Sequence, residues 1–140
     1  MWFYDSLNKI LEIYGGDMEL QRFNYLVDEL REYDGMEEIF VLSPEGEILF
    51  KSEEFQLSDE EAKAILKAWK ENEPALLFQS YRYAILKNDE IQLAAKNIVG
   101  AKGNIVGSIT KDGDYIIAHT QDKGLILLEW SIFINKVAWS

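Results

Sequence analysis

Three pairs of short apolar segments, each pair joined by a turn, constrain the fold of this chain most strongly. The pairs are residues 39–42 with 48–50, residues 80–87 with 90–96, and residues 104–111 with 115–120. In the first turn, Pro44 presets the backbone for a tight reversal and Gly46 accepts the positive φ that closes it. In the last turn, Asp112-Gly113 is a strong hairpin signal. The sequence therefore predicts an antiparallel sheet built from hairpins.

Helical periodicity predicts four helices before, between and after these hairpins. They span residues 3–14, the segment between Asp17 and Gly35, residues 59 to about 72, and residues 124–139. Ser58 and Glu61 fit a capping box at the start of the third helix, and Pro74 stops its continuation. Helices that alternate with hairpins predict an α+β fold, in which helices sandwich an antiparallel sheet of about five to six strands.

The domain organisation follows from the pair Gly15-Gly16, the one point in the chain that resembles a linker. It separates the first helix from the rest of the chain. We therefore expect an N-terminal helical extension over residues 1–16 and a single domain over residues 17–140.

The net charge of −11 is unevenly distributed. Residues 1–61 hold 17 acidic and 4 basic side chains, whereas residues 62–140 hold 8 acidic and 10 basic ones. This balance disfavours nucleic acid as a partner, because affinity for nucleic acid comes largely from Lys and Arg at the phosphates. The sequence shows no secretory signal and no apolar run of the roughly 20 residues that a membrane span requires. A cytoplasmic protein is expected.

Candidate chemistry is sparse, because the 140 residues include one histidine and no cysteine. His119 has no neighbouring partner that would make it a general base. The acidic pairs lack the spacing of metal ligands, and Asp59 to Glu61 instead suit a helix N-terminus. The glycine-rich stretch at 100–104 lacks the order of a phosphate loop. We therefore predict a non-enzymatic protein without a cofactor or a metal.

The C-terminal segment 124–139 is apolar on most sides of its expected helix. A helix of this kind is normally buried. Either the chain's own sheet buries it on most sides, or the N-terminal helix or another subunit covers part of it.

From about residue 19 to residue 139 the order of elements resembles the roadblock/dynein-light-chain superfamily, which has a profilin-like α/β/α fold. The resemblance is carried by the helix that ends at residues 30–36, by the hairpin over residues 39–50 and by the helix, strands and closing helix that follow. These motifs describe packing and turns and identify no site.

The resemblance implies a homodimeric scaffold or interaction module, with a small Ras-like GTPase or another protein as partner. In such a dimer the middle helices pair and the sheets join edge to edge. The residues expected at the dimer or partner interface are Ala64, Lys67, Ala68, Glu71, Tyr81 and Tyr83.

A second hypothesis is a small-ligand sensor, since PAS-like and profilin-like sandwiches share this order of elements. It requires a pocket between the sheet and a helix. The aromatic residues expected in its wall are Trp69, Tyr81, Tyr83 and Trp130.

Overall fold

The computed structural model describes residues 18–52 and 54–140. Its helices are α2 (Leu20–Leu30), α3 (Asp59–Lys70) and α4 (Leu127–Ala138). Its strands are β1 (Met36–Leu42), β2 (Ile48–Lys51), β3 (Ala75–Phe78), β4 (Tyr81–Asn88), β5 (Gln92–Lys96), β6 (Asn104–Ile109) and β7 (Tyr115–Thr120). The helix predicted over residues 3–14, and with it the extension 1–16, lies outside the described residues.

The strands form one antiparallel sheet in the order β2-β1-β7-β6-β5-β4-β3. The antiparallel α+β class is confirmed, whereas the expected five to six strands fall short of the observed seven. The prediction missed β3, a four-residue run that follows Pro74. Its turn into β4 uses Gln79 and Ser80 at positive φ of 52° and 72°. Because neither residue is glycine, the sequence carries no turn signal there.

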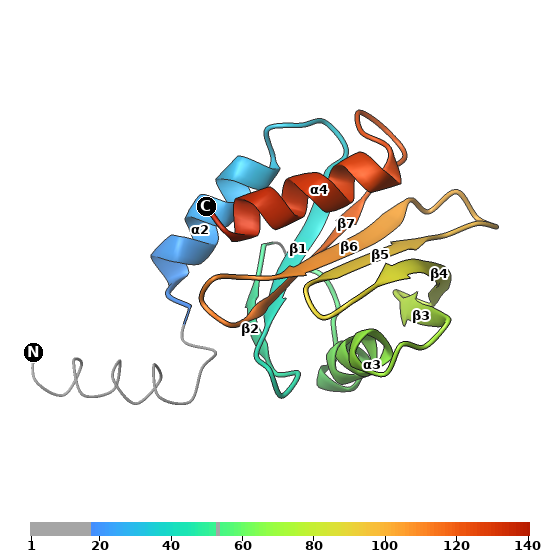
Figure 1. The fold of residues 1–140 in the computed structure, drawn as a ribbon, viewed down its shortest axis with the longest axis horizontal. Coiled ribbons are helices and arrows are strands. Elements are labelled where there is room, and N and C mark those ends of the chain that lie inside the picture. Colours follow the sequence, from blue (N-terminus) through green and yellow to red (C-terminus); the bar gives the residue numbers. More distant parts are fainter. Residues whose placement is uncertain (1–17, 53) are drawn as a thin grey trace, which may run out of the picture.

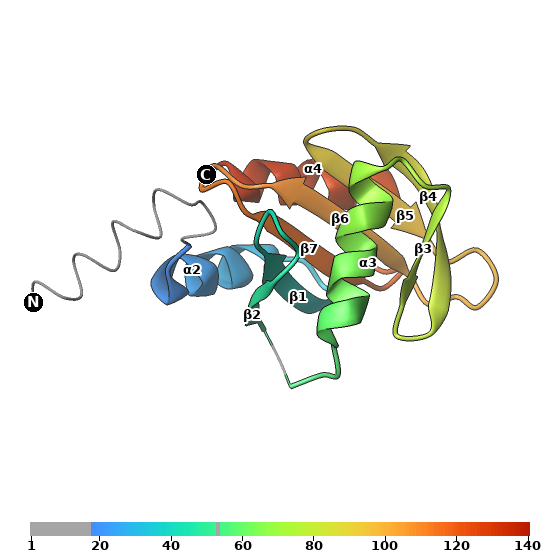
Figure 2. The same cartoon turned by 90° about the horizontal axis from the view of Figure 1, so that it is seen from below.

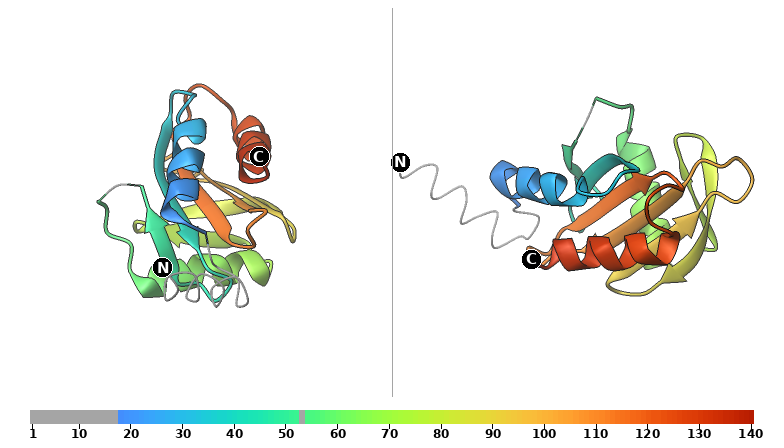
Figure 3. Two further views of the ribbon diagram at one scale, coloured as in Figure 1. Left: turned by 90° about the vertical axis from the view of Figure 1, so that its left-hand side faces the viewer. Right: turned by 90° about the horizontal axis from the view of Figure 1, so that it is seen from above.

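Helices cover the two faces of the sheet unequally (Figures 1 and 2). Helix α3 packs on one face, over a core that includes Phe40, Trp69 and Tyr83. Helices α2 and α4 lie together on the other face (Figure 3), over a core that includes Leu26 and Trp130. The sheet is therefore the middle layer of three.

Local signals placed α3 and the first hairpin correctly. Ser58 caps α3, because its hydroxyl accepts a hydrogen bond from the backbone N–H of Glu61 at 3.0 Å. The Glu61 carboxylate does not reach back to complete a capping box. It accepts instead from the backbone N–H of Gln79 at 2.7 Å and so ties α3 to the β3–β4 turn. Gly46 closes the β1–β2 turn at a φ of 88°.

Helix α4 is buried on one side only, so the first of the two alternatives, burial on most sides by the chain's own sheet, is not what the structure shows. On the side of α4 that faces the sheet, Trp130 and Ile134 are fully buried. Leu128, Ile132 and Trp139 remain 58%, 59% and 50% exposed. Among the described residues, nothing buries this second apolar side of the helix, so it is exposed.

Candidate protein-binding face

The uncovered part of the sheet lies beside α4. Helix α4 packs over β6 and β5, and no helix among the described residues packs over the same side of β4 and β3. Side chains alternate between faces along a strand, and Tyr83 belongs to the α3 core. The same alternation puts Arg82 and Ala84 on the α4 side, where they pair with Leu77 and Lys96. Leu77 is 61% exposed there.

A β-bulge enlarges this uncovered strip. The pairing of β4 with β5 shifts register between Ile85 and Lys87, so that Lys87 pairs with Ala94 on the α4 side. The extra residue, Leu86, is 60% exposed. Bulges commonly re-aim side chains in this way. The Lys87 amine donates a hydrogen bond to the Gln92 amide oxygen at 2.9 Å, which holds it along the strip.

Helix α4 supplies the other wall of this face. Leu128, Ile132 and Trp139 are spaced by one or two helical turns, so they line one side of the helix. The helix is fixed to the sheet by polar contacts from Gln92 to the Ser131 carbonyl at 3.1 Å, and from the Asn135 amide to Ser108 at 3.0 Å.

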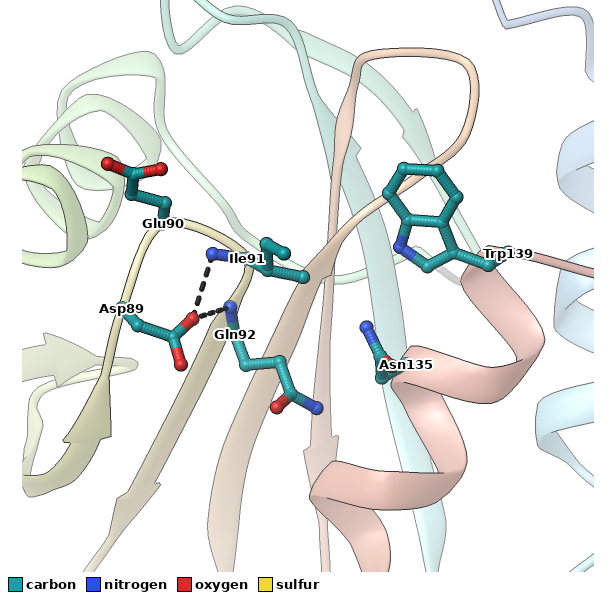
Figure 4. A pocket seen from close by; sticks show the side chains of 6 residues that line it. All are labelled: Asp89, Glu90, Ile91, Gln92, Asn135 and Trp139. Carbon is teal, nitrogen blue, oxygen red and sulfur yellow. Dashed lines mark hydrogen bonds between the residues drawn. The ribbon is translucent and has the colours of Figure 1, made fainter.

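A groove of about 560 Å³ joins the sheet to the C-terminal end of α4. Figure 4 shows Trp139 and Asn135 on its helical side and the β4–β5 turn on its other side. Ile91 is 46% exposed in that turn. The turn is rigid because the Asp89 carboxylate accepts from the backbone N–H groups of Gln92 at 2.7 Å and Ile91 at 2.8 Å. These bonds hold the pKa of Asp89 below its usual value.

We call this surface the β4–α4 face. Its residues are Leu77, Arg82, Leu86, Lys87, Ile91, Leu128, Ile132 and Trp139. It contains six of the thirteen large apolar side chains that are exposed in the described residues. Such clustering marks binding surfaces more than scattered exposed residues do.

Basic side chains border the β4–α4 face on the sheet side. Arg82 and Lys87 lie on it, and Lys96 stands next to Ala84 in an ion pair with Asp122 at 2.7 Å. The β4–β5 turn contributes the opposite charge through Asp89 and Glu90. The face therefore combines an apolar centre with a charged border, as protein–protein interfaces do.

The predicted interface residues lie on the other side of the sheet. Ala68 and Tyr83 are core residues, 2% and 1% exposed, and Tyr81 is 44% exposed beside the β3–β4 turn. Ala64 and Ala68 border a groove of about 360 Å³ at the β3 edge, and Leu77 and Arg82 of the β4–α4 face also line it. The exposed members of the set that remain available for a partner are Ala64, Lys67, Glu71 and Tyr81.

The aromatic residues of the sensor hypothesis do not share one pocket wall. Trp69 and Tyr83 belong to the core on the α3 side, whereas Trp130 belongs to the core beneath α4. The seven-stranded sheet separates them. Spacing along the sequence could not reveal this, because it does not say which face each element covers.

His119 is held in a polar cluster that the sequence did not predict. Its Nδ1 lies 2.7 Å from the Glu38 carboxylate, and its Nε2 lies 2.6 Å from the Lys102 carbonyl. These partners are 81 and 17 residues away. Through these two contacts the His119 ring ties β7 to β1 and to the residues that precede β6.

Comparison with known proteins identifies the family. The chain is 67% identical over 123 residues to Loki profilin-3 of Lokiarchaeum sp. (strain GC14_75), an alignment that spans 88% of this chain and all of that protein. The chain belongs to the profilin family. A scan against protein-family models finds no match. Profilins are non-enzymatic, so the expectation of a protein without enzymatic activity is confirmed.

Solved structures agree with this fold. The structure described as a complex of LokiProfilin2 with rabbit actin matches with a TM-score of 0.71 at 18% identity, covering 86% of this profilin and 95% of that chain. Profilin II of Acanthamoeba castellanii matches with a TM-score of 0.66 at 15% identity, covering 82% and 91%.

The family overturns the resemblance to the roadblock superfamily and the functions drawn from it. A homodimeric scaffold that regulates a small Ras-like GTPase and the alternative ligand sensor are both wrong for a profilin. The error has a physical reason. Both families place helices on either side of an antiparallel sheet, and the quoted motifs reflect packing and turns alone. Within the described residues, none of the helices has the length and apolarity to cross a lipid bilayer.

Proposed function

We propose that this profilin binds monomeric actin through the β4–α4 face. The observation that carries the proposal is its 67% identity to Loki profilin-3 along the whole of that protein. The complex of LokiProfilin2 with rabbit actin supports actin as the partner, because that chain has the same fold.

The structure favours the β4–α4 face over the α3 side for three physical reasons. Its apolar side chains are clustered and exposed, and burying such anchors supplies most of the energy of an interface. Its backbone belongs to a sheet and a helix, so binding orders little additional chain. Its border carries Arg82 and Lys87, whose charges can orient an acidic partner. On α3, the exposed side is dominated by charged residues such as Lys67 and Glu71.

A matched pair of variants tests the face. Leu86→Asp puts a charge on the β4–α4 face, where Leu86 is 60% exposed. Leu20→Asp makes the same change on α2, where Leu20 is 59% exposed. We expect Leu86→Asp to weaken the affinity for rabbit actin monomers at least tenfold, as for an interface anchor. Leu20→Asp should change it less than about twofold, as for a surface residue outside the interface.

The binding is measured by isothermal titration of each variant into actin monomers. Absence of binding by the unmodified chain would overturn the actin-binding function. Equal effects of Leu86→Asp and Leu20→Asp on the affinity would overturn the assignment of the binding site to the β4–α4 face. Lys67→Glu tests the interface predicted on α3, and a loss of affinity confined to Lys67→Glu would move the site there.

Two expectations from the sequence stay predictions beside this function. One is the cytoplasmic location. The other is the division of the chain into an extension over residues 1–16 and a domain over residues 17–140. Limited proteolysis followed by mass spectrometry tests the division, because a resistant fragment should then begin close to residue 17.

A further inference from the structure

The β5–β6 loop, residues 97–103, presents apolar side chains on a fixed backbone. Ile98 and Val99 are 68% and 96% exposed. The Asn97 amide oxygen accepts from the backbone N–H groups of Gly100 at 2.7 Å and Lys102 at 3.1 Å. The backbone N–H of Asn97 donates to the backbone carbonyl of Gly103 at 3.0 Å and closes the loop. Binding residues are often carried by loops that a rigid scaffold positions in this way.

The loop is continuous with the β4–α4 face. The Asn97 side-chain amide donates to the carbonyl of Arg82 at 2.9 Å, and Arg82 lies on that face. On the other flank, the ion pair of Lys96 with Asp122 links the end of β5 to the connection that leads into α4. A partner seated on the β4–α4 face therefore meets this loop at one end of the sheet.

His119 holds the far side of the loop, and its geometry requires a charged ring. The Glu38 carboxylate and the Lys102 carbonyl are both hydrogen-bond acceptors, at 2.7 Å and 2.6 Å from the two ring nitrogens. Neutral imidazole donates from one nitrogen only. The imidazolium ion satisfies both acceptors, whereas the neutral ring would turn a lone pair toward one of them.

The surroundings of the ring are acidic. From β1, the Glu38 carboxylate bonds the ring and the charge of Glu37 also acts on it, while the charge of Arg31 acts on Glu38. From β4, the Tyr83 hydroxyl donates to the same Lys102 carbonyl at 3.2 Å. Burial lowers the pKa of His119, but its hydrogen bonds and the two carboxylates outweigh burial and raise it above the usual value.

The pKa values of the two other titratable groups in hydrogen-bond contact with this cluster, Glu38 and Tyr83, are also shifted. The hydrogen bond from His119 holds the pKa of Glu38 below its usual value. Burial, with the negative charge of Glu38, raises the pKa of Tyr83 to about 12, so its hydroxyl remains a donor at neutral pH. Phe78 from β3 packs against the imidazole and adds no charge.

We propose that His119 is a positioning residue whose imidazolium form fixes the β5–β6 loop so that Ile98 and Val99 form a second contact with actin. This inference rests on the proposed actin-binding function. When the ring loses its proton, the bond to Glu38 or the bond to Lys102 is lost. The loop then loosens and the affinity for actin falls as the pH rises.

Two variants of the tether separate this mechanism from a structural role. Glu38→Gln offers neutral His119 an N–H donor, so the ring can accept from the new side-chain amide and still donate to Lys102. His119→Gln removes the titrating group itself. For the unmodified chain we expect the affinity for rabbit actin monomers to fall about threefold to tenfold between pH 6.5 and pH 9, the range of one or two hydrogen bonds.

The two variants should differ in their affinity for actin, and in both the affinity should be independent of pH apart from the titration of actin itself. Glu38→Gln should retain the high affinity across this pH range, and His119→Gln should show a low affinity across it. Because actin also titrates, the affinity of each variant is compared with that of the unmodified chain at the same pH. Val99→Ser should reduce the affinity at pH 6.5 and should have little effect at pH 9, where the loop is loose.

The state of the loop is measured without actin as well. Amide hydrogen exchange of residues 98–102 should quicken as the pH rises, beyond its intrinsic pH dependence, in the unmodified chain and not in Glu38→Gln. This measurement also covers the case in which His119→Gln fails to fold. If actin does not bind at any pH, the proposed function fails, while exchange still reports on the tether.

Three results would overturn the inference. The first is an actin affinity that depends on pH identically in the unmodified chain and in Glu38→Gln. The second is loop exchange with the same pH dependence in both proteins. The third is an actin affinity that Val99→Ser leaves unchanged at pH 6.5.

Discussion

The two ends of the sheet differ in how much of each strand is covered. Residues 39–42 of β1 are buried on both faces, between α2 on one side and the α3 core on the other. In β4, Tyr83 is buried on the α3 side while Arg82 and Leu86 are exposed. Near one end, at β1, the sheet is thus a closed core, and near the other end, at β4, it is a half-open surface.

This difference separates stability from function in the molecule. A strand covered on both faces contributes to the core along its whole length. A strand covered on one face keeps a rigid backbone and leaves its other side chains free to bind. The proposed actin-binding face lies where the coverage by α4 ends, and the substitutions below test that separation.

The largest expected effect is at the closed end. Phe40 is fully buried and its ring stacks on that of Phe78, with 6.0 Å between ring centroids. Phe40→Ala should lower the free energy of unfolding by about 3–5 kcal/mol, because it leaves a cavity in the core. Leu86→Ala at the open end should change it by at most about 0.5 kcal/mol. Urea denaturation measures both, and equal losses would contradict the difference between the two ends.

A smaller loss is expected at Gly103, which ends the β5–β6 loop at a φ of 84°. A Cβ there would overlap the backbone carbonyl oxygen of Thr120, so Gly103→Ala should lower the free energy of unfolding by about 2–4 kcal/mol. Gly113 has a similar φ of 92°, but open space surrounds the position that a Cβ would occupy. Gly113→Ala should therefore lower the free energy of unfolding by only about 1 kcal/mol. Thermal unfolding that ranks the two variants in the opposite order would contradict this account of the loop.

The helices that cover the two faces begin differently. The Ser58 hydroxyl caps α3, whereas the residue before α4, Ile126, has an apolar side chain and only its backbone N–H is bound, by the Glu129 carboxylate at 3.0 Å. Ser58→Ala should lower the free energy of unfolding by about 1 kcal/mol, and Ser58→Asp should retain most of it. Urea denaturation compares the two variants. An equal loss in both would show that the cap does not stabilise α3.

The smallest expected effect is the pH dependence of stability from the His119–Glu38 pair. The raised pKa of His119 gives stabilisation that is complete below the usual histidine pKa and is lost as the pH rises through the folded value. The lowered pKa of Glu38 gives stabilisation that is complete above the usual glutamate value and is lost as the pH falls through the folded value. The pair therefore contributes fully from about pH 4.3 to about pH 6.5.

Glu38→Gln should lower the free energy of unfolding within this range by roughly 0.5 kcal/mol, the scale of a partly exposed ion pair. Outside the range the two proteins should converge. Urea denaturation at pH 5.5 and pH 9 measures the difference. A constant offset at both values would show that the pair does not titrate as the geometry requires.

Much of the fold could be predicted because glycine and proline mark most of its turns. Gly46 and Gly113 occupy the positive-φ positions of two hairpins, and Ser58 begins α3 as expected. The β3 strand was missed because Gln79 and Ser80 adopt positive φ without being glycine. The sequence did not reveal their conformation, since the contact with Glu61 that accompanies it comes from another element.

The candidate site was far less predictable than the fold. The bulge at Leu86 changes which side chains face α4, and no residue in this segment is of a type that predicts a bulge. The pairing of His119 with Glu38 joins strands that are distant in the sequence. Which side of α4 stays uncovered depends on the order of strands in the sheet. The predicted interface on α3 followed from the roadblock resemblance and not from the residues themselves.

The most direct test of the central claim is hydrogen–deuterium exchange of the full chain with and without rabbit actin monomers. The β4–α4 face predicts protection on binding in residues 81–92, which span β4 and the β4–β5 turn, and in residues 128–139, which span most of α4 and Trp139 at its end. It predicts little change in residues 59–71, which include α3. Protection confined to residues 59–71, or none at saturating actin, would contradict the account.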